Sequence, residues 1–390
     1  MKNAIYFQGG GPTAVINASF EGLYEAYKKD SERGKLFVSP YGLNGLINGT
    51  IEEVKDQDYS SLLFRPGSHF GSSRIKVKPD DDISPKIAET LRKNDIHVVF
   101  GNGGNDTMLT CYQLFLNAKK LGYCLQVIGI PKTIDNDLLC MDHTPGYGSA
   151  AKYIANATIG CYLDAYTYPK QKAYIIEAMG RDSGYLAAAS KLAALKHMGP
   201  DFIYVPERPF SLADFLAKVE KKEEEKGQCI VVVSEGIRDK DGKLIAESGN
   251  KDAFGNPLMG GVSSFLAGQL ENAGVKSRPI ELNVIQRAAF FSLSLTDVKE
   301  AELVGKKAYL LAKANKTGKM VTLARKNSNP YKAVTGTADL MDVAKGVQSL
   351  PDKFINEEGD NITDEFFSYA APLIQGDVKN VFDKDGLLKL

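Results

Sequence analysis

The sequence lacks an excess of charge of either sign, and it lacks any long apolar run. Lysine and arginine together number 48, and aspartate and glutamate together also number 48. Proteins that bind nucleic acids or membrane surfaces carry a basic face, so these balanced and interspersed charges argue against both partners. No apolar run approaches the ~20 residues that a membrane-spanning helix needs. A metabolite is therefore the expected partner.

Cysteines are few and widely spaced. The five cysteines are Cys111, Cys124, Cys140, Cys161 and Cys229, and four of them lie in apolar contexts. This pattern predicts buried, reduced thiols rather than disulfides or a zinc site. The apolar run near the N-terminus is too short for the core of a signal peptide. We therefore expect a cytoplasmic protein.

Two common nucleotide-binding motifs are absent, because neither GxxxxGK[ST] nor GxGxxG occurs. Four other glycine-bearing turns follow apolar runs, at residues 8–13, 101–107, 179–184 and 234–236. Glycine lets a ligand approach the backbone closely, and the start of a helix offers free amides to an anion. Each turn alone is weak evidence, since about half of such turns only connect elements.

Short β-rich runs alternate with longer helical patterns along the 390 residues. The expected strands cover residues 3–8, 96–102, 125–130 and 172–179, and the expected helices cover 14–29, 106–122, 149–166 and 184–198. Such alternation predicts an α/β fold with doubly wound parallel sheets, in which ligands bind at the carboxyl ends of the strands. A break between two units is expected near 137–148, a loop or hairpin at 238–257, and a solvated helix end at 218–227.

The strongest chemical signal is GIPKTIDNDL at residues 129–138, directly after an expected strand. Lys132, Thr133, Asp135 and Asp137 place an ammonium, a hydroxyl and two carboxylates within six residues. A carboxylate there can accept a proton from a substrate hydroxyl, and a lysine can neutralise a phosphoryl group in transfer. Arginines at 74 and 181 could hold a sugar phosphate, although surface salt bridges explain each of them equally well.

Five motifs occur in a fixed order: GGNDT, PKTIDND, EAMGR, SEG and QR. With this order and spacing the chain resembles the phosphofructokinases, from Gly9 to about Gly305. The resemblance implies two doubly wound parallel-sheet domains with the active site in the cleft between them. Residues 1–140 and about 255–305 would bind the phosphoryl donor, and residues 141–254 and about 306–390 would bind the sugar phosphate.

The resemblance also implies a role for each matched residue. Asp135 would be the general base that takes the proton from the C1 hydroxyl of fructose 6-phosphate. The sugar phosphate would contact Thr133, Ile134, Asp137, Met179, Gly180, Arg181, Glu235, Val284 and Arg287, with Lys172 and Arg278 supplied by a neighbouring subunit. The donor would contact Gly10, Gly11, Arg74, Asp106, Thr107 and Lys132. Asn105 and Asp106 would hold Mg²⁺.

Two positions indicate which donor is used. The ATP-using relatives have GGDGS and PGTIDND, whereas this chain has Asp106 and Lys132 in place of two glycines. An aspartate would crowd and repel the α-phosphate of ATP, while a lysine can bind pyrophosphate and stabilise charge on the leaving phosphate. The pair is typical of the pyrophosphate-dependent branch, and we count both residues with Asp135 as catalytic.

Three residues depart from the family pattern. Asn105 stands where many members have a magnesium-associated aspartate, and an amide oxygen is a poorer ligand for a hard cation. Lys172 replaces an arginine and loses its bidentate fork. Val284 occupies a position often held by His or Tyr, so one hydrogen bond to the sugar is missing.

The resemblance, together with these residues, implies reversible phosphoryl transfer from pyrophosphate to fructose 6-phosphate, in glycolysis and gluconeogenesis, by a Mg²⁺-requiring homodimer or homotetramer. Two alternatives stay open: an ATP-dependent enzyme of the same family, and a catalytically silent regulatory subunit with the same fold.

Overall fold

Uninterrupted apolar runs form the central strands of two sheets. The computed structural model describes residues 2–168, 172–246, 261–379 and 381–389. Residues 98–100 and 229–233 are buried at every position. Burial on both faces is what parallel strands covered by helices require, and it explains why these runs lack polar alternation.

The chain divides into two compact units. Unit 1 comprises Met1–Ser149, Arg287–Val347 and Gln375–Leu390, and unit 2 comprises Ala150–Gln286 and Gln348–Ile374, counting only residues that the structure describes. The first boundary, between Ser149 and Ala150, falls just after the range 137–148 and nine residues after the boundary at residue 140 that the resemblance implied. The later bounds differ from the expected ones, because α8 (Val262–Asn272) and β9 (Ser277–Glu281) belong to unit 2. The hairpin of β10 (Lys319–Ser328) and β11 (Tyr331–Asp339) extends the sheet of unit 1. The expected boundary at 254/255 lies outside the described residues.

Unit 1 is built on a seven-stranded sheet with the order β11-β10-β5-β4-β1-β2-β3. Its five inner strands are parallel, whereas β3 and β11 run antiparallel at the two edges. Its elements are β1 (Asn3–Gln8), α1 (Ile16–Lys28), β2 (Leu36–Val38), α2 (Leu43–Asn48), β3 (Glu52–Glu53), a 3₁₀ turn (Ser60–Leu63), α3 (Ile83–Lys93), β4 (Ile96–Gly103), α4 (Asn105–Lys120), β5 (Gln126–Pro131), a 3₁₀ turn (Phe290–Ser292), α10 (Leu295–Lys313), β10 (Lys319–Ser328), β11 (Tyr331–Asp339) and α11 (Leu340–Val343).

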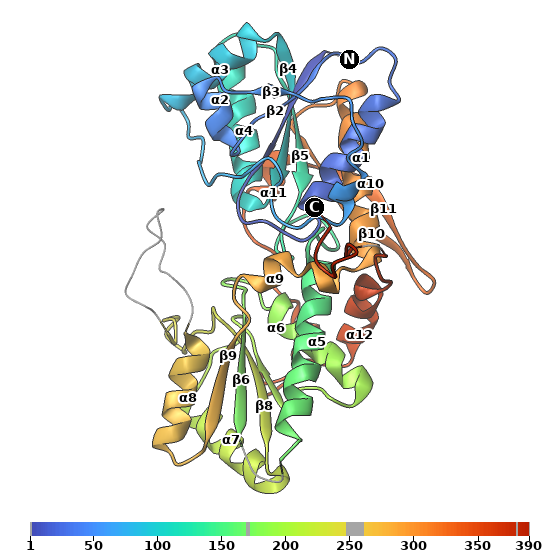
Figure 1. Ribbon diagram of the computed structural model, residues 1–390. Helices are drawn as coiled ribbons and strands as arrows, with labels where there is room; N and C mark the ends of the chain where they lie inside the picture. The colour runs from blue at the N-terminus through green and yellow to red at the C-terminus, as the bar shows by residue number, and fades with distance from the viewer. Residues whose placement is uncertain (1, 169–171, 247–260, 380, 390) are drawn as a thin grey trace. The chain divides into compact units, whose positions relative to one another are not determined.

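Helices cover both faces of this sheet (Figure 1): α1 and α10 lie on one side, and α3 and α4 on the other. Two glycines allow α1 and α10 to pack closely. A methyl group at Gly22 would overlap the carbonyl oxygen of Glu302, and one at Gly305 would overlap that of Ser19. The core below includes Phe20 of α1.

Unit 2 is built on a four-stranded, fully parallel sheet with the order β7-β8-β6-β9. Its elements are β6 (Ala173–Ala178), α6 (Tyr185–Ala189), a 3₁₀ helix (Ser190–Lys196), β7 (Phe202–Tyr204), α7 (Leu212–Lys226), β8 (Cys229–Ser234), α8 (Val262–Asn272), β9 (Ser277–Glu281), a 3₁₀ turn (Asp352–Phe354), α12 (Glu365–Ala370) and a 3₁₀ turn (Ala371–Ile374). Helices α5 (Tyr147–Ala165) and α9 (Ile285–Ala288) cross the boundaries between the units. Phe215 of α7 and Leu266 of α8 share a core with β8.

Most expected elements are confirmed, with two local differences. The helix expected at 184–198 changes to 3₁₀ geometry at Ser190, whose hydroxyl donates to the carbonyl of Ala187 at 2.6 Å. The expected loop at 238–257 begins as a tight turn, in which Asp239 N donates to Lys243 O at 2.9 Å; its residues 247–257 lie outside the described residues. The charged run at 218–227 ends α7, as expected, with Gly227 in the left-handed conformation.

The expectation of buried cysteines was only partly right. Cys111 and Cys229 are buried, and burial raises the pKa of Cys111 to about 12. Cys124 and Cys140 are exposed. Cys124 follows the turn that ends α4, and Cys140 lies in the loop after β5. Apolar residues next to them in the sequence therefore did not predict their exposure. In the part of the chain that the structure describes, no helix has both the length and the apolar character needed to cross a membrane.

Candidate active site

The first glycine turn, after β1, is held by the backbone on both sides. Gly9 N donates to Asn102 O at 2.9 Å, and Gly10 N donates to Ser73 O at 3.0 Å. Gly10 has a φ of +76°, which strongly favours glycine, and a methyl group there would lie 3.5 Å from Lys132 Nζ. The turn therefore exposes backbone directly beside a cation.

Lys132 and Arg287 bring positive charge to this turn. The Lys132 ammonium donates to the carbonyl of Gly11, and its residue is only 4% exposed. A methyl group at Gly11 would lie 3.4 Å from Arg287 Cζ. Sequence reasoning assigned Arg287 to the sugar phosphate, and the structure places its guanidinium beside the first glycine turn of unit 1.

The surroundings of Lys132 shift the pKa of its ammonium group. Burial, aided by Arg287 and Arg74 and opposed by Asp135 and Asp137, lowers the pKa of Lys132 to about 8. The same interactions place Arg74 within electrostatic range of the ammonium. Four predicted site residues thus surround Lys132 in unit 1.

The second glycine turn, after β4, starts helix α4. The hydroxyl of Thr107 fills the space that a side chain at Gly9 or Gly103 would need, so the two glycine turns interlock. Asp106 lies in the first turn of α4, where a carboxylate interacts favourably with the helix dipole. Its Oδ1 is 2.9 Å from Lys76 Nζ, and its side chain is 69% exposed.

The loop after β5 carries the two predicted carboxylates. Asp135 N donates to Thr133 Oγ1 at 3.1 Å, and the Thr133 hydroxyl lies 3.5 Å from Asp135 Oδ2. Asp137 accepts a hydrogen bond from Asn105 Nδ2 at 2.9 Å. Burial and the charge of Asp135 raise the pKa of Asp137 to about 7. Ile134, between Thr133 and Asp135, is buried.

Two oxygens at this loop are suited to a hard cation. Asn105 Oδ1 and Asp137 Oδ1 are both buried, and neither has a hydrogen-bond partner among the described residues. Buried polar atoms are normally paired, and Mg²⁺ prefers oxygen ligands. The described residues contain no group of three or more His, Cys, Asp or Glu that could hold a metal ion. These two oxygens fit a Mg²⁺ that takes its other ligands from water and substrate.

In unit 2, predicted sugar-phosphate residues gather where β6 and β8 end. Met179 and Gly180 follow β6, and Glu235 follows β8. Gly180 N donates to Glu235 Oε1 at 3.3 Å, and Glu235 N donates to Ala178 O at 2.9 Å. Arg181 Nε is buried and has no hydrogen-bond partner among the described residues. An unsatisfied buried guanidinium nitrogen is suited to an anionic ligand.

Three other predicted residues do not join this cluster. Arg278 opens β9 opposite Tyr174, at the amino end of the sheet, and Lys172 directly precedes β6 at that same end. Arg278 lies 3.8 Å from Asp164 and over the ring of Tyr174. Val284 is 62% exposed. Because parallel strands point the same way, Lys172 and Arg278 are separated from Met179 and Glu235 by the length of β6.

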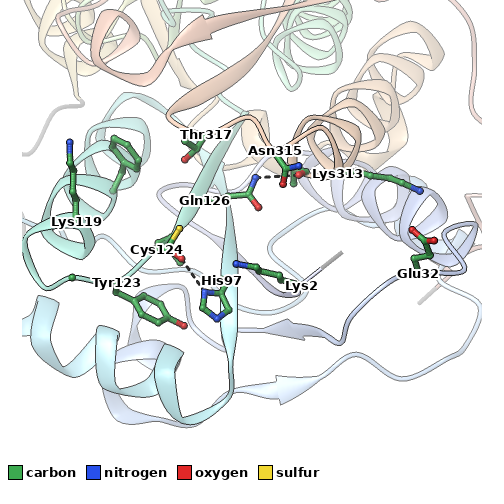
Figure 2. A pocket seen from close by; sticks show the side chains of 14 residues that line it. Lys2, Glu32, His97, Lys119, Tyr123, Cys124, Gln126, Lys313, Asn315 and Thr317 are labelled. Carbon is green, nitrogen blue, oxygen red and sulfur yellow. Dashed lines mark hydrogen bonds between the residues drawn. The ribbon is translucent and has the colours of Figure 1, made fainter.

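A pocket of about 910 Å³ lies elsewhere in unit 1, around the amino ends of its parallel strands. Figure 2 shows its lining, which includes Lys2, His97, Cys124, Gln126 and Lys313. None of the predicted site residues lines it. The predicted groups instead follow the carboxyl ends of β1, β4 and β5, where ligands of such sheets bind.

Sequence reasoning missed three features of the site. Lys76, the partner of Asp106, lies two residues after Arg74 and could have been noticed as a second cation of that segment. Gln286 is buried and accepts a hydrogen bond from Met179 N at 3.1 Å. Its position in the QR motif was the available signal. The unpaired oxygen of Asp137 had no signal in the sequence.

Comparisons with known proteins identify the family of the chain. Residues 3–311 match the model of the family described as phosphofructokinase, and the chain belongs to that family. It is 39% identical to a pyrophosphate–fructose 6-phosphate 1-phosphotransferase of Halomonas elongata, over 96% of the chain and 92% of that protein. A protein of that name from Xanthomonas campestris is also 39% identical, with 99% and 95% covered. A crystal structure of a pyrophosphate-dependent phosphofructokinase from Nitrosospira multiformis superposes with a TM-score of 0.89 at 36% identity, covering 99% and 95% of the two chains.

Proposed function

We propose that this protein is an enzyme that transfers a phosphoryl group between pyrophosphate and the C1 hydroxyl of fructose 6-phosphate, in either direction. The relatives named above carry this activity in their names. The observation that carries the choice of donor is the position of Lys132. Its buried ammonium contacts the first glycine turn, a place suited to a terminal phosphate.

Unit 1 supplies the groups for the donor and for proton transfer. Asp135 takes the proton of the C1 hydroxyl as that oxygen bonds to the phosphorus, while the bond from this phosphorus to the bridging oxygen breaks. The products are fructose 1,6-bisphosphate and phosphate. Lys132, Arg74 and the amides near Gly10 and Gly11 stabilise charge on the leaving phosphate. Asp106 and Thr107, at the start of α4, flank the donor and exclude a nucleotide α-phosphate.

Unit 2 supplies the sugar-phosphate groups, namely Met179, Gly180, Arg181 and Glu235. We propose that Arg181 binds phosphate, on the support of its unpaired buried nitrogen, and that Glu235 accepts sugar hydroxyls. Mg²⁺ would be held by Asn105 and Asp137, with Asp106 as a further candidate, and would neutralise pyrophosphate charge when bound. Lys172 and Arg278 would serve the site of a second subunit in a homo-oligomer. A cytoplasmic location completes the proposal, since both substrates are charged metabolites.

Donor-dependent kinetics test the proposal. With fructose 6-phosphate and equal Mg²⁺, we expect turnover with pyrophosphate and little or none with ATP, and with phosphate and fructose 1,6-bisphosphate we expect the reverse reaction. Turnover with ATP alone would overturn the choice of donor. Asp135→Ala should abolish transfer while leaving sugar-phosphate binding measurable by calorimetry. Undiminished turnover in that variant would remove Asp135 as the base, and an inactive wild type that binds both substrates would favour a regulatory subunit.

A further inference from the structure

A histidine is buried in the loop that follows the two carboxylates of the site. His143 is 2% exposed, and each of its ring nitrogens faces a carboxylate. Nδ1 lies 2.7 Å from Asp142 Oδ2, and Nε2 lies 2.7 Å from Glu300 Oε2 in α10. Because a carboxylate can only accept, both ring nitrogens must donate, so the ring is an imidazolium.

The surrounding charges explain why a buried ring can stay charged. Burial alone would lower the pKa of His143, but Glu300 and Asp142 outweigh this and raise it to about 9. Arg325 of β10 donates to Asp142 Oδ2 at 3.1 Å from Nη2, and the hydroxyl of Tyr331 donates to Glu300 Oε1 at 2.6 Å. Two cations and two carboxylates therefore balance in one cluster around the buried His143 and Glu300. We call these five residues the His143 network.

The His143 network is joined to the catalytic loop by the next residue. Thr144 donates from both its backbone N and its hydroxyl to Asn136 Oδ1, at 2.8 and 3.2 Å. Asn136 is 1% exposed, has a φ of +59°, and lies between Asp135 and Asp137. Its left-handed backbone sets the directions in which the two aspartates leave the chain.

A second carboxylate of α10 fixes the other end of the same loop. Asp297 accepts from Gly146 N at 2.8 Å and from Ser149 N at 2.9 Å, and it lies one helical turn before Glu300. Thr133 N donates to Pro145 O at 3.3 Å. The segment from Thr133 to Ser149 is thus held to α10 at two points.

We propose that His143 is a positioning residue for phosphoryl transfer, acting through the charge-balanced His143 network to fix the Asp135–Asp137 loop against α10 and the β10–β11 hairpin. This inference rests on the proposed role of Asp135. It makes a distinct prediction, because the hydrogen-bond partners of His143 among the described residues, Asp142, Glu300 and Tyr331, are not predicted substrate contacts. Loss of its charge should impair the orientation of the base and leave substrate affinity nearly unchanged.

Kinetics of His143→Gln test this inference on the full-length protein. We expect kcat to fall about tenfold or more, with the KM values of both substrates changed by less than about threefold, because small misplacements of a catalytic group are costly. His97→Gln is the matched control, since His97 belongs to unit 1 and lies at the amino end of β4; its kinetics should equal those of wild type. A folded His143→Gln enzyme with wild-type kcat would overturn the proposal.

A charge-compensating double variant distinguishes electrostatic positioning by the His143 network from a simple loss of packing. His143→Gln leaves an uncompensated buried carboxylate, whereas His143→Gln with Glu300→Gln restores neutrality. We expect the double variant to have a higher kcat than His143→Gln alone, and equal or lower kcat would contradict electrostatic positioning. If His143→Gln does not fold, Tyr331→Phe decides: kcat should fall about threefold for one lost hydrogen bond, and an unchanged kcat overturns the proposal.

Asp135→Ala, measured alongside, keeps the two hypotheses distinguishable. If Asp135→Ala is inactive and His143→Gln is fully active, only the inference about His143 fails. If Asp135→Ala retains full turnover, the proposed base is wrong, whatever the His143 variant shows.

Discussion

Lys132 carries an ammonium group where burial disfavours charge. A surface lysine stays mostly charged up to about pH 10, but burial lowers the pKa of Lys132 to about 8. Asp135 and Asp137 on the same loop oppose that shift. The residue is therefore charged at neutral pH and loses its charge over the next pH units.

This pKa predicts that the pH profile of kcat/KM for pyrophosphate declines on its alkaline side. Lysine binds the anion only when protonated, so kcat/KM for pyrophosphate should fall as pH rises through about 8, approaching tenfold per pH unit. Initial rates between pH 6.5 and 9.5 measure it. Lys132→Arg, which stays protonated throughout, is the control and should lack this decline even if its activity is lower. A wild-type profile that stays flat to about pH 9.5 would contradict the prediction.

Asp106 has a different setting from the one that its sequence suggested. The carboxylate does not stand alone at the glycine turn, because Lys76 pairs with it at 2.9 Å. Both side chains are substantially exposed, so the pair contributes little to stability. The pair instead orients Asp106, because Lys76 binds one of its carboxylate oxygens beside the start of α4.

Among the elements, helices α1 and α10 pack with little space between their backbones. The close approach at Gly22 and Gly305 brings the backbones of the two helices together, and α10 then presents Asp297 and Glu300 to the loop after β5. Helix packing and site geometry are therefore linked through α10.

Gly22→Ala tests this packing. Replacing a glycine in a helix interior by alanine normally raises the free energy of unfolding by about 0.5–1 kcal/mol. At Gly22 the new methyl group would overlap a backbone carbonyl that cannot rotate away, so we expect destabilisation of about 1–3 kcal/mol instead. Equilibrium unfolding in urea measures the difference. Gly268→Ala in α8, where a methyl group meets nothing within 4 Å, is the control and should be neutral or stabilising. An equal increase in the free energy of unfolding of both variants would show that α1 and α10 can move apart.

At the scale of the whole molecule, the placement of Lys172 and Arg278 is the main feature to explain. Both lie at the amino end of the unit 2 sheet, whereas the groups near Met179 lie at its carboxyl end. One chain cannot use both sets on one sugar phosphate across the length of a strand. This separation supports the proposal that a second subunit completes each site.

Complementation between inactive variants tests the shared site. We expect Asp135→Ala and Arg278→Ala homo-oligomers each to be nearly inactive. Mixing them under conditions of subunit exchange should restore about a quarter of wild-type activity for a dimer, because half of the dimers are hybrids with one intact site. Activity is measured before and after exchange, with each variant exchanged against itself as the control. No recovery despite proven exchange would show that Arg278 acts within its own chain, and an active Arg278→Ala homo-oligomer would show that it has no role.

Much of the fold follows from local sequence. The runs at residues 3–8 and 96–102 have the length and composition of buried parallel strands, and the structure confirms them almost to the residue. The division into units was less predictable after the middle of the chain. Whether a strand such as β10 joins one sheet or another depends on pairing with distant strands, which no local pattern encodes.

The residues of the site were predictable in kind, but their partners were not. Sequence by itself determined the chemistry: which turns lack side chains, where the carboxylates and cations stand along the chain, and the family to which these motifs belong. Only the tertiary structure decided that Lys132 is buried against Gly11, that Lys76 meets Asp106, and that His143 lies between two carboxylates. Charge state and orientation depend on burial and on neighbours brought from remote parts of the chain, and these exist only once the chain has folded.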